Sequence, residues 1–290
     1  MPKTTSTSLR TSRRGALITG LAAAVAANVS RPAAAEAADA GRLPLTAEAT
    51  EGPYYFDARK FRPDITEGRQ GVPLAVRFTV LDLDRRPWRG ARVDIWHCDA
   101  QGVYSGYAGQ GEDRRLSTEG ETFLRGSLLT DAQGVAEFTT IYPGWYHGRT
   151  THIHFKVLND ARAVLTSQFF LPDALSEYLY TQLPDYRRAT LRDTLNSTDG
   201  IALQAGPTVH GAVREDARSY VASLTLVVDP AARPVAERPP MPGDGRGPDG
   251  PRGGPGRPPP RPPLLEGHAR VSALVPGGRG RAVPTNHGSE

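Results

Sequence analysis

The chain has 290 residues, which fits one or two domains, and it carries a net charge of +4. The positive excess lies at the two ends, with a net charge of +3 over residues 1–40, +4 over residues 231–290 and about −3 over the middle. The charge therefore gives no reason to expect nucleic-acid binding by the middle of the chain. The single cysteine, Cys98, excludes an intramolecular disulfide and a paired-cysteine zinc site.

Residues 1–40 have the layout of an export signal. The paired arginines Arg13-Arg14 precede an uncharged, alanine-rich run at Gly15–Val29, and small residues at Ala33–Ala37 offer cleavage sites. This arrangement resembles a twin-arginine signal. The run is shorter than the ~20 apolar residues that a membrane span needs. The sequence thus predicts an exported protein whose mature form has no integral membrane segment.

Residues 41–230 predict an all-β domain, an antiparallel β-sandwich with long loops and at most one or two short helices. Short segments with apolar residues at every second position are separated by turn residues, as in sandwich folds. One short helix is expected at Asp173–Tyr180, and Gly200–Pro207 is expected to be a loop. The expected strands are Leu74–Val80, Val93–Ile95, Phe123–Leu129, Val135–Ile141, Thr151–Val157, Arg162–Phe170 and Ser219–Val228.

Residues 231–290 contain 14 prolines and 12 glycines, with nine arginines. Such a composition buries too little apolar surface to offset the entropy of the chain. The sequence therefore predicts a disordered Pro/Gly/Arg-rich tail.

The stretch Tyr142–Val157, YPGWYHGRTTHIHFKV, carries the strongest chemical signal. His152 and His154 fall on one face of the expected strand, and apolar residues occupy the other face. Two imidazoles two residues apart on a rigid strand can bind one metal ion. Tyr146 follows a Pro-Gly turn and can fold back over the same face. A half-exposed strand that merely carries two histidines remains the alternative at this point.

Four segments in order resemble the intradiol ring-cleavage dioxygenases, in their compact, secreted form. They are IWHCDAQGVYS, FLRGSLLTDAQGVAEFTTIYPGWY, the pattern Arg149-x-x-His152-Ile153-His154, and LTSQ ending at Gln168. Together these segments cover roughly residues 51–170.

The resemblance implies an iron(III) enzyme with four protein ligands. Tyr104 and Tyr146 would supply phenolate oxygens, and His152 and His154 would supply imidazole nitrogens. By the same resemblance, Tyr146 also acts as a base, while Arg149 and Gln168 lie beside the substrate. The expected reaction opens a catechol-type ring between its two hydroxyls with O2 and gives a muconate-type diacid.

Several alternatives accompany this assignment. Trp145 stands where the family has glycine, which leaves the geometry of the Tyr146 turn open, and Tyr142 and Tyr107 compete with the two assigned tyrosines. His97 is expected to be structural, whereas His147 could touch substrate. Tyr54 and Tyr55 are expected to pack at the sheet edge rather than to line a pocket mouth.

Two other functions compete with the dioxygenase. One is a non-catalytic β-sandwich that serves as a binding module. The other is a zinc or copper site that uses the two histidines alone. The short spacing between Tyr146 and His152 further predicts a shallow site that is open to substituted catechols.

Overall fold

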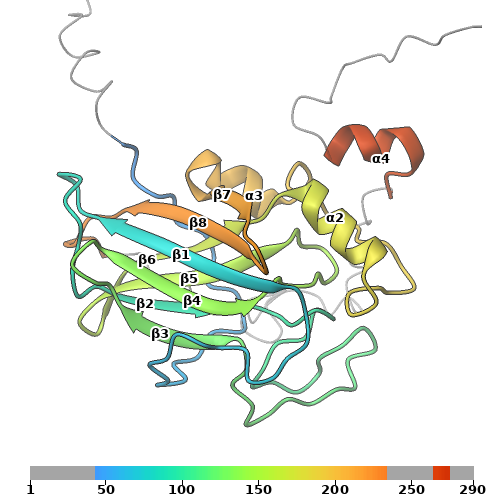
Figure 1. Cartoon of the computed structure of the whole chain (residues 1–290), viewed down its shortest axis with the longest axis horizontal. Helices are drawn as coiled ribbons and strands as arrows, with labels where there is room; N and C mark the ends of the chain where they lie inside the picture. The colour runs from blue at the N-terminus through green and yellow to red at the C-terminus, as the bar shows by residue number, and fades with distance from the viewer. Residues whose placement is uncertain (1–42, 234–263, 275–290) are drawn as a thin grey trace, which may run out of the picture. The chain divides into compact units, whose positions relative to one another are not determined.

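A computed structural model describes residues 43–233 and 264–274. Two four-stranded sheets form its centre, in the orders β4-β1-β8-β7 and β3-β2-β5-β6 (Figure 1). The strands are β1 (Pro73–Leu81), β2 (Arg92–Trp96), β3 (Arg125–Leu129), β4 (Val135–Ile141), β5 (His152–Asn159), β6 (Arg162–Phe170), β7 (Ala212–Glu215) and β8 (Tyr220–Val227). The predicted all-β sandwich is confirmed.

The core lies between the two sheets. In β1 the side chains of Val76, Phe78 and Val80 are fully buried, while the residues between them are more exposed. Alternation of this kind places every second side chain of a strand on one face. Phe78 contacts Phe155 of the opposite sheet with ring centroids 5.0 Å apart. This apolar layer fixes β5 in place from one side.

The pairing of the strands departs from the prediction at one place. Strand β1 pairs with β8 in parallel, with Val76 opposite Ala222, whereas the other strand pairs are antiparallel. A parallel pair needs a long connection, and most of the domain lies between these two strands. Strand β7, which was not predicted, covers the outer edge of β8.

The described residues contain three short α-helices, where at most one or two were expected. Helix α2 (Asp173–Gln182) confirms the predicted helix. Helix α3 (Gly200–Ala205), followed by the 3-10 turn η1 (Pro207–Val209), replaces the loop predicted there. The Asp199 carboxylate accepts hydrogen bonds from the backbone N–H groups of Ile201 and Ala202, which caps α3.

Helix α4 (Gly267–Leu274) lies within the segment predicted as a disordered tail. Its Arg270 is buried against α2 and forms an ion pair with Glu177. The rest of the predicted tail, and the predicted export signal, lie outside the described residues.

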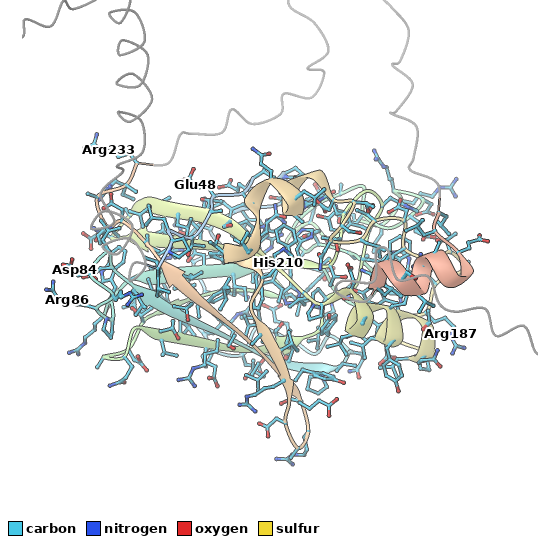
Figure 2. The ribbon with its side chains drawn as sticks, turned by 90° about the horizontal axis from the view of Figure 1, so that it is seen from above. Glu48, Asp84, Arg86, Arg187, His210 and Arg233 are labelled. Carbon is cyan, nitrogen blue, oxygen red and sulfur yellow. The ribbon has the colours of Figure 1, made fainter. Side chains whose placement is uncertain are left out.

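Many charged side chains point away from the core, as the labelled Asp84, Arg86 and Arg187 illustrate (Figure 2). The exposed pair between Arg86 and Asp84, at 2.8 Å, contributes little stability because water screens both charges. No helix among the described residues is long and apolar enough to span a membrane.

Candidate metal centre

Strand β5 brings the two histidines together. His152 and His154 project from the face opposite Phe155, and their Nε2 atoms lie 3.0 Å apart. Strand β5 pairs with β2 on one side and with β6 on the other, which places Trp96 and Gln168 next to His154. Both imidazoles are only 2% exposed. The predicted placement on one strand face is confirmed, although this face is buried rather than half-exposed.

The His152 ring is held in one tautomer. Its Nδ1–H donates to the backbone carbonyl of Thr150 at 2.6 Å, so that Nε2 keeps its lone pair. Burial, together with the positive charge of Arg149, lowers the pKa of His152 to about 3. Burial also lowers the pKa of His154, and the Nδ1 atom of His154 has no hydrogen-bond partner within the described residues. Both rings are therefore neutral, which is the form that binds a metal ion.

Tyr104 approaches His154 from the loop after β2. Its backbone N–H donates to the Gln110 side chain at 3.0 Å, and its ring stacks on Tyr54 with centroids 4.5 Å apart. The Tyr104 hydroxyl is buried and makes no hydrogen bond of normal geometry within the described part of the chain. Burial, together with nearby Tyr146, raises the pKa of this hydroxyl well above its usual value. A buried polar atom without a partner is costly and calls for an explanation, such as an ion.

Tyr146 lies across the site from the turn before β5. Its hydroxyl lies 3.1 Å from His152 Nε2, and its ring meets that of Tyr104 edge-on with centroids 5.7 Å apart. Burial raises the pKa of this hydroxyl as well. Tyr146 is partly exposed, whereas Tyr104 is only 1% exposed. Of the two tyrosines, Tyr146 is thus the less buried as a residue, although its hydroxyl lies in the interior.

Trp145 does not disturb this turn. Its side chain is 2% exposed and packs into the main core, and the Arg188 guanidinium lies 4.0 Å from its ring centroid. Tyr146 belongs instead to the aromatic group around Trp96 and Tyr104. The bulky Trp145 side chain thus lies in the core, while that of Tyr146 lies in the aromatic group at the site. The Tyr146 hydroxyl therefore reaches His152 in spite of the substitution of glycine.

Arg149 and Gln168 also meet at the site. The Arg149 guanidinium donates to the Gln168 side-chain oxygen, and the Gln168 amide donates to the Thr50 carbonyl at 2.8 Å. On its other side, Arg149 Nε donates to Asp199 at 2.9 Å. The guanidinium is thus fixed between two acceptors next to the histidine pair.

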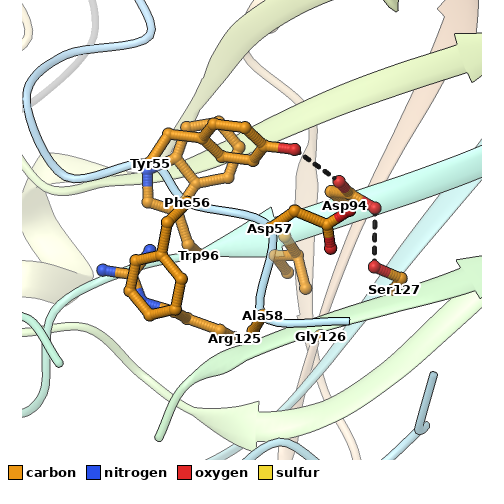
Figure 3. A pocket seen from close by; sticks show the side chains of 10 residues that line it. Tyr55, Phe56, Asp57, Ala58, Asp94, Trp96, Arg125, Gly126 and Ser127 are labelled. Carbon is orange, nitrogen blue, oxygen red and sulfur yellow. Dashed lines mark hydrogen bonds between the residues drawn. The ribbon is translucent and has the colours of Figure 1, made fainter. Parts of the chain in front are cut away.

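The support beneath His154 comes from Trp96 and Tyr55. The indole of Trp96 stacks on His154 with ring centroids 4.9 Å apart, and the Tyr55 ring packs in turn on Trp96 with centroids 4.7 Å apart. Figure 3 shows Tyr55 and Ser127 donating to the two oxygens of Asp94, at 2.8 and 2.7 Å. Tyr55 thus packs on the sheet, as expected, whereas Tyr54 reaches the site through its stacking on Tyr104.

The competing residues lie elsewhere. Tyr142 bonds Ser176 through its hydroxyl, and the His97 ring contacts Thr140 and the Cys98 carbonyl, all in the interior. His147 pairs with Asp193 at 3.1 Å. No group of three or more His, Cys, Asp or Glu side chains within the described ranges could hold a metal ion. Within the described ranges, His152 and His154 therefore have no third imidazole or carboxylate beside them that could complete a metal site.

Sequence reasoning missed Asp199 and Trp96 as parts of the site. Asp199 lies fifty positions after Arg149, so that no spacing connects the two residues. The signal that could have identified it is the pair Asp199-Gly200 before Ile-Ala-Leu-Gln-Ala, which is typical of a helix N-cap.

The donor set fits a hard cation. Two phenol oxygens and two imidazole nitrogens converge, and both imidazoles are neutral. The Tyr104 hydroxyl has no hydrogen-bond partner among the residues that the structure describes. Iron(III) is a hard acid that accepts such oxygen and nitrogen ligands.

A family model described as dioxygenase matches residues 50–183, which include all six predicted site residues. An intradiol ring-cleavage dioxygenase of Tetranychus urticae superposes with a TM-score of 0.60 at 29% identity, over 66% of this chain and 97% of that structure. The domain that contains residues 50–183 belongs to the intradiol ring-cleavage dioxygenase family. Members of this family are oxidoreductases that incorporate both atoms of O2.

Curated relatives of this intradiol dioxygenase agree with that placement. The catechol 1,2-dioxygenase of Acinetobacter baylyi is 28% identical over 71% of this chain and 70% of its own length. Catechol 1,2-dioxygenase 1 of Acinetobacter lwoffii is 31% identical over 43% of this chain. The match spans 45% of the length of that second relative, so that more than half of it has no counterpart in the alignment.

Proposed function

We propose that this protein is an exported iron(III) dioxygenase that cleaves catechol-type aromatics between their two hydroxyls and releases muconate-type diacids. The observation that supports it most strongly is the convergence of two phenols and two neutral imidazoles in a buried site. Tyr104, Tyr146, His152 and His154 would hold the iron. When bound, ferric iron supplies the electron-accepting centre that makes a catechol reactive toward O2.

The protein side chains would divide the remaining work. Tyr146, the less buried of the two tyrosines, would as a phenolate take a proton from a catechol hydroxyl, while Tyr104 stays in place. The Arg149 guanidinium, fixed by Gln168 and Asp199, would stabilise negative charge that develops on the ring oxygens. The aromatic group around Trp96 keeps water away from His154.

The first test is metal analysis and the visible absorption of the purified protein, before and after anaerobic addition of catechol. We expect bound iron and a tyrosinate-to-iron(III) band that shifts on addition of catechol. Admission of O2 should then consume one O2 per catechol and yield a muconate. A protein that takes up no iron, even on reconstitution, would contradict the proposal.

Two tyrosine variants test whether the Tyr146 hydroxyl takes part in substrate binding and turnover. Tyr146→Phe should abolish the band's response to catechol and lower kcat by at least about 100-fold, since the base is removed. Tyr142→Phe is the matched control, because its hydroxyl bonds only the buried Ser176. It should keep the band and the activity and lose about 1 kcal/mol of unfolding free energy. Equal activity of Tyr146→Phe and the wild type would exclude the assigned role.

The export part of the proposal rests on the sequence of residues 1–40. Replacing Arg13-Arg14 by two lysines should retain the protein in the cytoplasm, as judged by fractionation of the producing cells. Secretion of this variant at the wild-type level would argue against the twin-arginine route.

A further inference from the structure

Residues 193–199 form hydrogen bonds to the turn that carries Tyr146 and leads into β5. At the start of this segment, Asp193 accepts hydrogen bonds from the ring of His147 at 3.1 Å and from the Gly148 N–H at 3.0 Å. The segment contacts the turn again through Asn196 and Asp199. The turn therefore does not depend on its own backbone alone for its shape.

Thr150 connects residues 193–199 to the metal centre through hydrogen bonds on both sides. Its N–H donates to Asp199 at 2.9 Å and its hydroxyl donates to Asn196 at 2.9 Å. Its carbonyl accepts the bond from His152 Nδ1 at 2.6 Å. All three polar groups of Thr150 are thus satisfied, and the orientation of the His152 ring follows from the position of Thr150.

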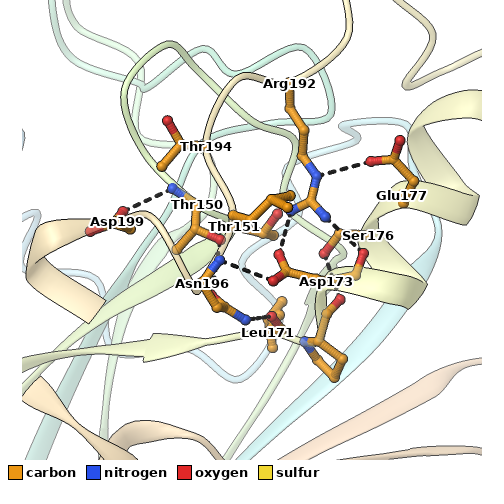
Figure 4. Close-up of polar contacts among 12 residues, drawn as sticks. Thr150, Thr151, Leu171, Asp173, Ser176, Glu177, Arg192, Thr194, Asn196 and Asp199 are labelled. Carbon is orange, nitrogen blue, oxygen red and sulfur yellow. Dashed lines mark hydrogen bonds and ion pairs between the residues drawn. The ribbon is translucent and has the colours of Figure 1, made fainter. Parts of the chain in front are cut away.

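Asp199 links the same segment to Arg149. One carboxylate oxygen accepts from both Arg149 Nε and the Thr150 N–H, and the other oxygen caps α3. The side chain is buried, with its residue 2% exposed. Burial alone would raise the pKa of this carboxyl, but Arg149 and the surrounding N–H donors hold it below its ordinary value. Asp199 is therefore the charged partner that fixes Arg149. Figure 4 shows its contact with Thr150.

The segment of residues 193–199 is itself anchored to helix α2. The Asn196 N–H donates to Asp173 at 3.0 Å, and Asp173 pairs with the buried Arg192 at 2.7 Å. Arg192 also pairs with Glu177, one helical turn further along α2, at 3.1 Å. Figure 4 shows these contacts running from Glu177 through Arg192 and Asp173 to Asn196.

Helix α4 closes this chain of contacts. Arg270 donates two hydrogen bonds to the Glu177 carboxylate, at 2.6 and 2.8 Å, and two more to the Arg192 carbonyl at 3.3 Å. Two guanidinium groups and two carboxylates thus lie together, and their formal charges balance; Glu177 is half-buried and the other three residues are buried. A paired arginine fork is geometrically specific, because both N–H groups must align with both oxygens.

We propose that Asp199 and Asn196 are positioning residues for Arg149 and His152, and that the C-terminal helix α4, through Arg270, clamps the segment that carries them. The catalytic consequence of this arrangement rests on the proposed function. The mechanical coupling between α4 and the turn before β5 is independent of the proposed function.

Hydrogen–deuterium exchange of the full-length protein tests the coupling. Arg270→Ala should speed exchange about fivefold or more in peptides that cover residues 193–199 and 146–154, because the anchored segment opens more often. Arg270→Lys keeps the charge but loses the fork, so that a smaller increase is expected in the same peptides. Arg77→Ala removes an exposed arginine of β1 that pairs with Glu137, and it should change neither peptide. Faster exchange confined to α2 and α4 in both Arg270 variants would overturn the clamp.

Asp199→Asn tests positioning, since asparagine can still cap α3 but gives Arg149 no charged partner. With iron-loaded protein and catechol, assayed well below the melting temperature, we expect kcat to fall about tenfold. The melting temperature should fall as well, because the amide NH2 group cannot accept from the buried N–H donors of Arg149 and Thr150. Asn196→Ala should lower kcat in the same direction, because Thr150 loses one of its two anchors. Wild-type kcat in Asp199→Asn would overturn the positioning role. If the wild type itself fails to turn over catechol, the proposed function is wrong. Hydrogen–deuterium exchange of Asp199→Asn then tests the positioning role by itself. Faster exchange of residues 146–154 supports that role, and unchanged exchange overturns it.

Discussion

At the scale of single residues, burial decides which protonation state each group of the metal centre holds. It lowers the pKa of His152 and His154 and raises the pKa of Tyr104 and Tyr146. The nitrogens are thus ready to bind a cation, while the phenols stay protonated until a cation favours the phenolate. Uptake of iron should therefore release protons, because ligands bind in their deprotonated form.

His97 is a buried histidine away from the metal centre, and it predicts a specific pH dependence. Burial, together with the charge of Arg125, lowers its pKa to about 4 from an ordinary value of 6.5. In the folded state Nδ1–H donates to the Cys98 carbonyl, and Nε2 accepts from Thr140. Because the unfolded chain binds the proton more tightly, stability from this residue is present above pH 6.5 and is lost as the pH falls toward 4.

The variant His97→Gln isolates this effect. Between pH 7 and pH 4.5, the wild type should lose about 2 kcal/mol more unfolding free energy than the variant does. Urea unfolding at the two pH values measures the difference. A variant that loses as much stability as the wild type over this interval would show that His97 does not titrate as described.

At the scale of elements, the turn before β5 depends on a close backbone approach. The Gly144 N–H donates to the Asp99 carbonyl at 2.9 Å, and a Cβ at Gly144 would lie 2.3 Å from the Ala100 carbonyl oxygen. A backbone atom cannot move aside as a flexible side chain can. The turn that aims Tyr146 at the site therefore has no room for a side chain at this position.

Gly144→Ala should accordingly destabilise the fold by about 1–3 kcal/mol and weaken iron binding, since the turn must shift to relieve the clash. Gly200→Ala is the matched control, because a Cβ at the first residue of α3 meets nothing within 4 Å. It should leave stability within about 0.5 kcal/mol or raise it. Thermal unfolding and iron titration of both variants give the comparison, and equal stability of the two would refute the packing argument.

At the scale of the whole domain, one core between two sheets sets the position of the site. Phe155 is fully buried in that core, on the face of β5 opposite His154. Phe155 contacts Phe78 on the core face of the sheet, while Trp96 of the neighbouring strand β2 stacks on His154 on the other face. The histidine pair thus depends on packing that the sheets provide together.

Phe155→Ala should cost about 3–5 kcal/mol of unfolding free energy through the cavity that it leaves. Phe61→Ala provides the control, since Phe61 is 58% exposed, and it should change stability by less than about 1 kcal/mol. Chemical denaturation of both variants measures these differences. A loss in Phe155→Ala as small as that in Phe61→Ala would contradict the assignment of the core.

The sequence by itself determined the strands other than β7, the two faces of β5 and the placement of His152 and His154 on one of them. These features are local: alternation sets which side chains share a face, and His-x-His with its preceding Pro-Gly turn occupies one short stretch. The assignment of Tyr104, Arg149 and Gln168 came from the family resemblance. Family resemblance over the same motifs supplied the chemistry.

Only the tertiary structure decided what joins distant parts of the chain. It pairs β1 with β8 in parallel, turns the expected loop after Asp199 into helix α3, and brings Asp199 to Arg149 across fifty positions. It also places Arg270 of the predicted tail against α2. These contacts leave no periodic trace in the sequence, because side chains far apart along the chain meet only after the sheets have packed. The shared face of His152 and His154 was therefore predictable from local pattern, whereas the groups that hold these side chains in place were not.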